Sequence, residues 1–126
     1  MNFKSEQELY DYIGTFLIKQ GKQSKNGDIC LYRGPNGIKC AVGCVLSDHY
    51  YRKDMDYGIF SNGAYTATQL IKTFKVPKFF EKFGVFLNDA QYVHDCDANW
   101  DGGPNDFKEA WRIFGYARGL NISKFE

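Results

Sequence analysis

The chain has 126 residues, of which 44% are hydrophobic and 17% aromatic. This length is typical of one domain, and the apolar share suffices for a core that needs neither a metal nor disulfides. Sixteen Lys and Arg face fifteen Asp and Glu, so the net charge is only +1, which argues against non-specific nucleic-acid binding. We expect one globular domain over residues 1–126 that requires no cofactor or metal.

The sequence contains no apolar run of the length of a signal sequence or a membrane span. We therefore expect a cytoplasmic protein without a membrane partner. Its four cysteines are Cys30, Cys40, Cys44 and Cys96. Because thiols stay reduced in the cytoplasm, free cysteines are expected rather than disulfides.

Helical patterns cover most of the chain. Ser5 and Glu8 form a capping-box signature, and the apolar residues that follow predict a helix over 6–20, ended by Gly21. Similar patterns predict a short helix over 66–74, a second from Pro77 to Gly84 and a third over 85–96. The clearest apolar face predicts a last helix that starts at 104–106 and stops at Gly119.

The middle of the chain predicts a small sheet and a long loop. Residues 29–32 and 38–40 flank the turn residues 34–37 and indicate a β-hairpin, with Asn36 and Gly37 able to take positive φ. Segment 41–46 continues the strand or forms a short buried helix, of which we favour the helix. Segment 48–63 is predicted to be an irregular loop, within which residues 57–60 could form a short strand. The expected fold is α+β, with four to five helices packed with a small antiparallel hairpin.

Gln91, His94 and Asp95 share one face of the helix predicted over 85–96. Asp95 or Gln91 could orient His94 as a general base, with Cys40 as a nucleophile after a Gly-rich turn at a helix start. The alternative is structural, because free cysteines are usually buried and a His–Asp pair often closes a helix end.

The sequence offers ligands for two possible metal sites, but neither set matches a complete metal-binding motif. Zinc could bind Cys30, Cys40, Cys44 and either His94 or Cys96, but the paired C-x2-C spacing is missing. Residues 97–102 match the start of a calcium loop, D-x-N-x-D-G, yet its twelfth position is Lys108 instead of Glu. We predict no metal at either place.

The tyrosines between Tyr50 and Tyr65 are interleaved with the charged residues Arg52, Lys53, Asp54 and Asp56. Exposed aromatic rings beside cations can stack on a nucleobase or anchor a protein partner. The simpler interpretation is a solvated loop with its rings packed inward.

Two segments resemble a group of small uncharacterised proteins of tailed phages and bacterial genomes. They are 32–48, with K-C-A-V-G at its centre, and 87–95, with Q-x-x-H-D. The likeness spans roughly residues 20–120 and implies a phage setting, hence a host cytoplasm, without an established activity. It favours Cys40, Gln91, His94 and Asp95 as site residues and disfavours calcium.

Three functions follow as hypotheses. The first is a phage accessory protein that binds a host protein, so inhibiting a host factor or defence, or sequesters a nucleotide-like small molecule. Its expected ligand-binding residues are Tyr32, Arg33, Asp48, Tyr51, Gln91, His94 and Asp95. The second is a cysteine-dependent hydrolase or transferase that uses Cys40, His94, Asp95 and Gln91. The third is a structural or calcium-binding module.

Overall fold

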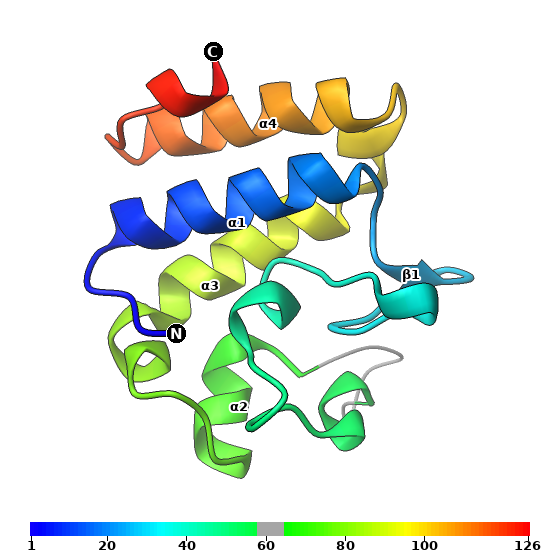
Figure 1. Ribbon diagram of the computed structural model, residues 1–126, viewed down its shortest axis with the longest axis vertical. Coiled ribbons are helices and arrows are strands. Elements are labelled where there is room, and N and C mark those ends of the chain that lie inside the picture. Colours follow the sequence, from blue (N-terminus) through cyan, green and yellow to red (C-terminus); the bar gives the residue numbers. More distant parts are fainter. Residues whose placement is uncertain (58–64) are drawn as a thin grey trace.

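The computed structural model describes residues 1–57 and 65–126. This part of the chain contains the α-helices α1 (Glu6–Gln20), α2 (Ala67–Thr73), α3 (Phe79–Asp95) and α4 (Pro104–Ala117). Strands β1 (Lys25–Asn26) and β2 (Ile29–Cys30) pair antiparallel, with Lys25 opposite Cys30. In Figure 1, α4 lies above α1 and runs in the opposite direction, α3 crosses below, and α2 lies at the far end. The predicted α+β class is confirmed.

Local signals explain where α1 begins and ends. The Ser5 hydroxyl accepts a hydrogen bond from the Glu8 amide at 3.1 Å, which satisfies a free N–H of the first turn. Gly21 ends the helix at φ 78°, a conformation that glycine adopts without strain. The predicted helix over 6–20 is therefore confirmed.

Helices α1 and α4 pack through a reciprocal aromatic pair. The Tyr10 hydroxyl donates to the Trp111 carbonyl at 2.8 Å, and Trp111 Nε1 donates to the Tyr10 carbonyl at 3.2 Å. The two rings stack with centroids 5.1 Å apart. Gly115 lets the tyrosine approach α4, since a Cβ there would stand 2.3 Å from Tyr10 Cζ. The predicted last helix is confirmed, and it is a main wall of the core.

Helix α3 corrects one prediction. The helices expected over 77–84 and 85–96 are one helix, with non-helical angles only at Phe83. Gly84 does not end it. Instead Gly84 lets α2 come close, because a Cβ would stand 3.2 Å from both Ile71 and Thr68. The predicted short helix over 66–74 is confirmed as α2, capped by the Thr66 side chain.

The small sheet exists, but its position differs from the prediction. The hairpin turns at residues 27–28, and the predicted hairpin keeps a single bridge between Arg33 and Lys39. Across it, the Cys40 and Gly34 amides donate to the carbonyls of Tyr32 and Ile38. Two other amides bond elsewhere: Tyr32 N donates to Asp56 Oδ1 at 2.5 Å, and Lys39 N donates to Gln20 Oε1 at 2.8 Å. These tertiary bonds replace a longer ladder.

The turn chemistry of this region was predicted correctly. Asn36 and Gly37 take positive φ, at 61° and 78°. The 41–46 segment contains one turn of 3-10 helix, Gly43–Val45, so the helical alternative was the better one. The optional strand at 57–60 lies mostly outside the described residues.

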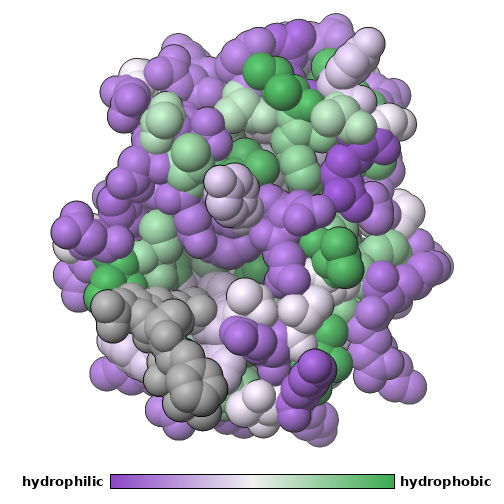
Figure 2. Space-filling model, turned by 180° about the vertical axis from the view of Figure 1, so that it is seen from behind, coloured by the Kyte–Doolittle hydropathy of each residue, from purple (hydrophilic) through white to green (hydrophobic). Residues whose placement is uncertain are grey.

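The buried apolar side chains form one cluster that all four helices share. No helix within residues 1–57 and 65–126 has the length and apolar character needed to cross a bilayer. The rear face of the molecule is mostly hydrophilic, and its hydrophobic groups lie in separate patches (Figure 2).

Candidate functional site

Gln91, His94 and Asp95 contact one another at the end of α3, and we call them the α3 polar cluster. Gln91 Nε2 lies 2.7 Å from Asp95 Oδ1, and His94 Nδ1 lies 2.8 Å from the same oxygen. His94 is fully buried, whereas the Asp95 side chain is 39% exposed. The structure therefore brings together three of the side chains that the sequence singled out.

The cluster also binds two loop segments. Gln91 Oε1 accepts a hydrogen bond from the Val42 amide at 2.9 Å. His94 Nε2 accepts one from the Ser24 amide at 3.0 Å. Buried backbone amides need such partners, so the cluster holds segments 23–24 and 41–43 against α3.

These bonds determine the tautomer that we infer for His94. Nε2 faces a backbone N–H, so it must present a lone pair, and the ring proton lies on Nδ1. Nδ1 then donates to the Asp95 carboxylate. Both ring nitrogens are engaged, and neither is free to take a proton from a nucleophile.

Cys40 lies in the core with no exposed surface. Burial, followed by the negative charge of Asp95, raises the pKa of its thiol well above the ordinary value. The Gly43 amide, 3.3 Å from the sulfur, offsets this only in part. No hydrogen bond joins Cys40 to His94 among the described residues. The arrangement keeps Cys40 protonated and lacks the contact that a Cys–His nucleophile needs.

Cys30 is the cysteine that lies beside the cluster. Its sulfur, a ring nitrogen of His94 and an oxygen of Asp95 all lie within 4.8 Å of one another. Burial and the charge of Asp95 raise the pKa of the Cys30 thiol to about 12. Sequence reasoning listed Cys30 only as a zinc ligand, because nothing in its spacing places it next to α3.

The proton positions argue against a metal ion at Cys30, His94 and Asp95. A metal on Nδ1 would require a proton on Nε2, which would then point at the Ser24 N–H at 3.0 Å. Two donors cannot share that contact. The four zinc ligands considered in the sequence analysis do not lie together either. Among the described residues, Cys40 and Cys44 are not part of the cluster formed by Cys30, His94 and Asp95.

The calcium-like turn uses its polar groups for local structure. Residues 97–100 form a turn of 3-10 helix. Asp97 Oδ1 accepts bonds from Lys25 Nζ at 3.0 Å and Gln23 Nε2 at 3.1 Å. The Asn99 amide donates to the Val93 carbonyl at the end of α3. These bonds account for the turn without an ion.

The other predicted ligand-binding residues form a second network around Arg33. Its Nη1 lies 2.5 Å from Asp48 Oδ1, and its Nη2 donates to the Leu46 carbonyl at 2.8 Å. The guanidinium lies 4.4 Å from the centroid of the Tyr51 ring, within range of a cation–π contact. Arg33 thereby holds both ends of the 46–51 loop.

Asp56 also belongs to this network. It is buried, and its carboxylate accepts two hydrogen bonds. The Tyr51 hydroxyl donates to Oδ2, and the Tyr32 backbone amide donates to Oδ1. The Tyr32 ring itself is fully buried. The Tyr32, Arg33 and Tyr51 side chains are thus committed to internal contacts, which fix the shape of the loop that follows Asp48.

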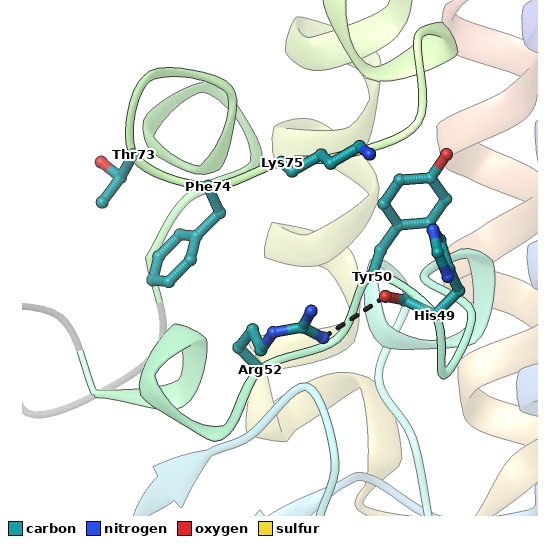
Figure 3. Close-up of a pocket in the computed structure, with 6 residues that line it drawn as sticks. All are labelled: His49, Tyr50, Arg52, Thr73, Phe74 and Lys75. Carbon is teal, nitrogen blue, oxygen red and sulfur yellow. Dashed lines mark hydrogen bonds between the residues drawn. The ribbon is translucent and has the colours of Figure 1, made fainter.

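A pocket of about 290 Å³ opens beside this loop (Figure 3). Segment 49–52 and the end of α2 supply its lining residues, which are His49, Tyr50, Arg52, Thr73, Phe74 and Lys75. Figure 3 shows Arg52, Phe74, Lys75 and Tyr50 around a common hollow. The lining contains two side chains of permanent positive charge, an imidazole and no carboxylate.

Its aromatic and cationic groups are held in place. His49 packs edge-on against Tyr50 at 4.8 Å between centroids, and Tyr65 packs edge-on against Phe74 at 5.3 Å. Arg52 Nη1 donates to the Tyr51 carbonyl at 2.9 Å and to the His49 carbonyl at 3.3 Å. Within residues 1–57 and 65–126, Nη1 is the only Arg52 nitrogen that donates a hydrogen bond.

Sequence reasoning identified one side of this pocket and missed the other. It named Tyr50 and Arg52 as part of a surface that could stack on a nucleobase, whereas Thr73, Phe74 and Lys75 were interpreted only as a helix end. The available signal was an aromatic residue placed directly before a lysine. The distance of more than twenty residues between the two sides hid their proximity.

A second groove of about 280 Å³ lies on α1. Its lining is Asp11, Tyr12, Thr15, Phe16, Lys19 and Lys124. It contains a carboxylate as well as two lysines, so its charge does not select one kind of ligand. The pocket beside segment 49–52 is therefore the better candidate site.

No model of a known protein family, no curated protein and no solved structure matches the chain.

Proposed function

We propose that the protein binds and sequesters a small nucleotide-like anion, with the pocket between segment 49–52 and the end of α2 as its site. The observation that carries this proposal is the composition of the lining: two aromatic rings, Arg52, Lys75 and His49, without an acidic side chain. Small-molecule sites usually combine apolar walls with a few polar groups that orient the ligand, and they start at volumes near this one.

The chemistry of a nucleotide fits both halves of the lining. A base can stack on Tyr50 or Phe74, a contact worth about 1–3 kcal/mol per base in single-strand binding proteins. A phosphate can accept hydrogen bonds from Lys75 and from the Arg52 N–H groups that have no partner among residues 1–57 and 65–126. Charge-assisted bonds of this kind are stronger than neutral ones.

The Arg33 network supports this role indirectly. It holds Tyr51 through the guanidinium contact and Asp56, so the neighbouring residues Tyr50 and Arg52 are positioned before any ligand arrives. A site that is ordered in advance loses less entropy on binding. The residues predicted from sequence would thus act by shaping the loop, and not by contact with the ligand.

Binding without turnover agrees with the state of the α3 polar cluster. Cys40 is buried, and the pKa of its thiol is raised. Both nitrogens of His94 carry hydrogen bonds. A cysteine-dependent reaction therefore has no support in this geometry. A host-directed role, in which the protein removes a signalling nucleotide, rests on the resemblance to phage proteins.

The test is a panel of the four nucleoside monophosphates, followed by calorimetry and by thermal unfolding. A ligand that binds the folded state raises the melting temperature. We expect at least one nucleotide to bind with one-to-one stoichiometry and to be recovered chemically intact. Arg52→Gln and Phe74→Ala should each abolish the shift, whereas Lys108→Gln on α4 should preserve it. Conversion of the nucleotide, or no binding to any nucleotide, would reject the proposal.

A further inference from the structure

The segments that line the pocket carry a net positive charge. Residues 49–54 and 72–78 contain five Lys or Arg side chains and one acidic residue, Asp54. The whole chain has 16 basic and 15 acidic residues, so the remainder is net negative. The five basic residues are Arg52, Lys53, Lys72, Lys75 and Lys78.

All five side chains belong to exposed residues, and within residues 1–57 and 65–126 none of them forms a salt bridge. Four of the other basic residues, Lys25, Arg33, Arg112 and Arg118, do form salt bridges. Lys25 pairs with Asp97, and Arg118 pairs with Glu6 and Asp89. The pocket region thus keeps an uncompensated charge, which raises the local concentration of anions.

Three of the five basic residues, Lys53, Lys72 and Lys78, lie outside the lining. Lys53 follows the lining residue Arg52 directly, Lys72 precedes the lining residue Thr73, and both lysines are exposed. A single phosphate inside the pocket would be satisfied by Arg52 and Lys75. The additional lysines would then have no function in binding.

We infer that the ligand carries more than one phosphate: a nucleoside polyphosphate whose base enters the pocket and whose phosphates extend over Lys53 and Lys72. This inference rests on the proposed function and specifies its ligand class. Lys side chains act as point charges on phosphate, so a chain of phosphates can contact several of them at once.

The experiment measures the affinity for a nucleoside and for its mono-, di- and triphosphate, with each of the four bases, by calorimetry at low and at physiological salt. For the preferred base we expect the triphosphate to bind about tenfold more tightly than the monophosphate, because several exposed ion pairs each add a modest gain. The triphosphate should also lose more affinity as salt rises.

Two variants test the placement of the phosphates. Lys53→Gln and Lys72→Gln should each weaken triphosphate binding severalfold and leave monophosphate binding unchanged. The matched control Lys108→Gln should change neither, since α4 lies at the opposite end of the molecule from α2 (Figure 1).

The possible failures are distinct. Equal affinity for mono- and triphosphate, or variants at Lys53 and Lys72 that bind the triphosphate normally, would overturn this inference and leave the nucleotide pocket intact. Inorganic tripolyphosphate that binds as tightly as the nucleoside triphosphate would overturn both, because the aromatic walls would then contribute nothing. Absence of binding to any nucleotide would also reject both.

Discussion

The Ser24 amide donates a hydrogen bond of 3.0 Å to Nε2 of the fully buried His94, so a loop before β1 is fastened to the last turn of α3. This contact joins residues seventy positions apart, and it gives His94 a structural role. The imidazole fills space, satisfies a buried donor and donates a hydrogen bond from Nδ1 to the Asp95 carboxylate.

His94→Ala should therefore destabilise the fold by about 2–4 kcal/mol, because it leaves a cavity and an unpaired buried amide. Urea unfolding followed by circular dichroism measures the change. His49→Ala is the matched control, since His49 is exposed and should cost under about 0.5 kcal/mol. Equal stability of the two variants would contradict the structural role.

Gly43, the glycine of the K-C-A-V-G segment, should not tolerate a side chain. A Cβ at this position would stand 2.0 Å from the Tyr32 carbonyl oxygen, which belongs to the backbone and cannot rotate away. We expect Gly43→Ala to cost about 3 kcal/mol or more, in the range of severe overpacking. In Gly84→Ala the new Cβ would meet only side-chain atoms at 3.2 Å, so this variant should cost clearly less stability than Gly43→Ala when both are measured by urea unfolding.

Features with a local cause could be predicted from the sequence. The Ser5 cap, the Gly21 stop and the positive φ of Asn36 each depend on a few neighbouring residues. The α3 polar cluster was also predictable, because its three members lie on one turn-spaced helix face. What they contact was not, since Ser24 and Val42 meet α3 only through the tertiary fold.

The predicted hairpin shows most clearly what local sequence patterns cannot predict. The turn signal at 34–37 was correct, but the Tyr32 amide bonds to Asp56, twenty-four residues later, and the ladder does not extend. The pocket could not be predicted for the same reason, because its two sides come from segments that no local pattern connects. Long-range pairing overrides local preference in both places.

Cys40 and Cys30 should resist alkylation in the folded protein at neutral pH. Burial raises the pKa of both thiols, and the thiolate is the reactive form. Iodoacetamide treatment followed by peptide mass spectrometry should modify them only after unfolding in urea. Cys96 is partly exposed, as is Cys30, so it serves as the internal control and should react before Cys30, whose thiol pKa is raised. Rapid labelling of folded Cys40 that depends on His94 would instead favour the cysteine-dependent enzyme.

The pKa shift of Cys30 also predicts a loss of stability in alkaline solution. Folding raises the pKa of this thiol from 9.0 to about 12, so above pH 9 the unfolded chain releases a proton that the folded chain retains. The thiol's contribution is thus fully present below pH 9 and is lost as pH rises toward about 12. Cys30→Ala should show a shallower decline over this window in urea unfolding, and an unchanged slope would refute the shift.

Asp56 should control both stability and ligand binding, because its two oxygens hold the Tyr51 hydroxyl and the Tyr32 amide. Asp56→Ala would leave that buried amide unpaired, and we expect a loss of about 1–3 kcal/mol. The released Tyr51 would also loosen its neighbours Tyr50 and Arg52, so nucleotide affinity should fall in the variant while it remains folded.

Asp54→Ala, which removes an exposed carboxylate from the same turn, separates the two effects. It should leave stability almost unchanged and should not weaken the nucleotide, since it removes negative charge near the pocket. A folded Asp56→Ala protein that bound the nucleotide normally would show that the Arg33 network does not position the site.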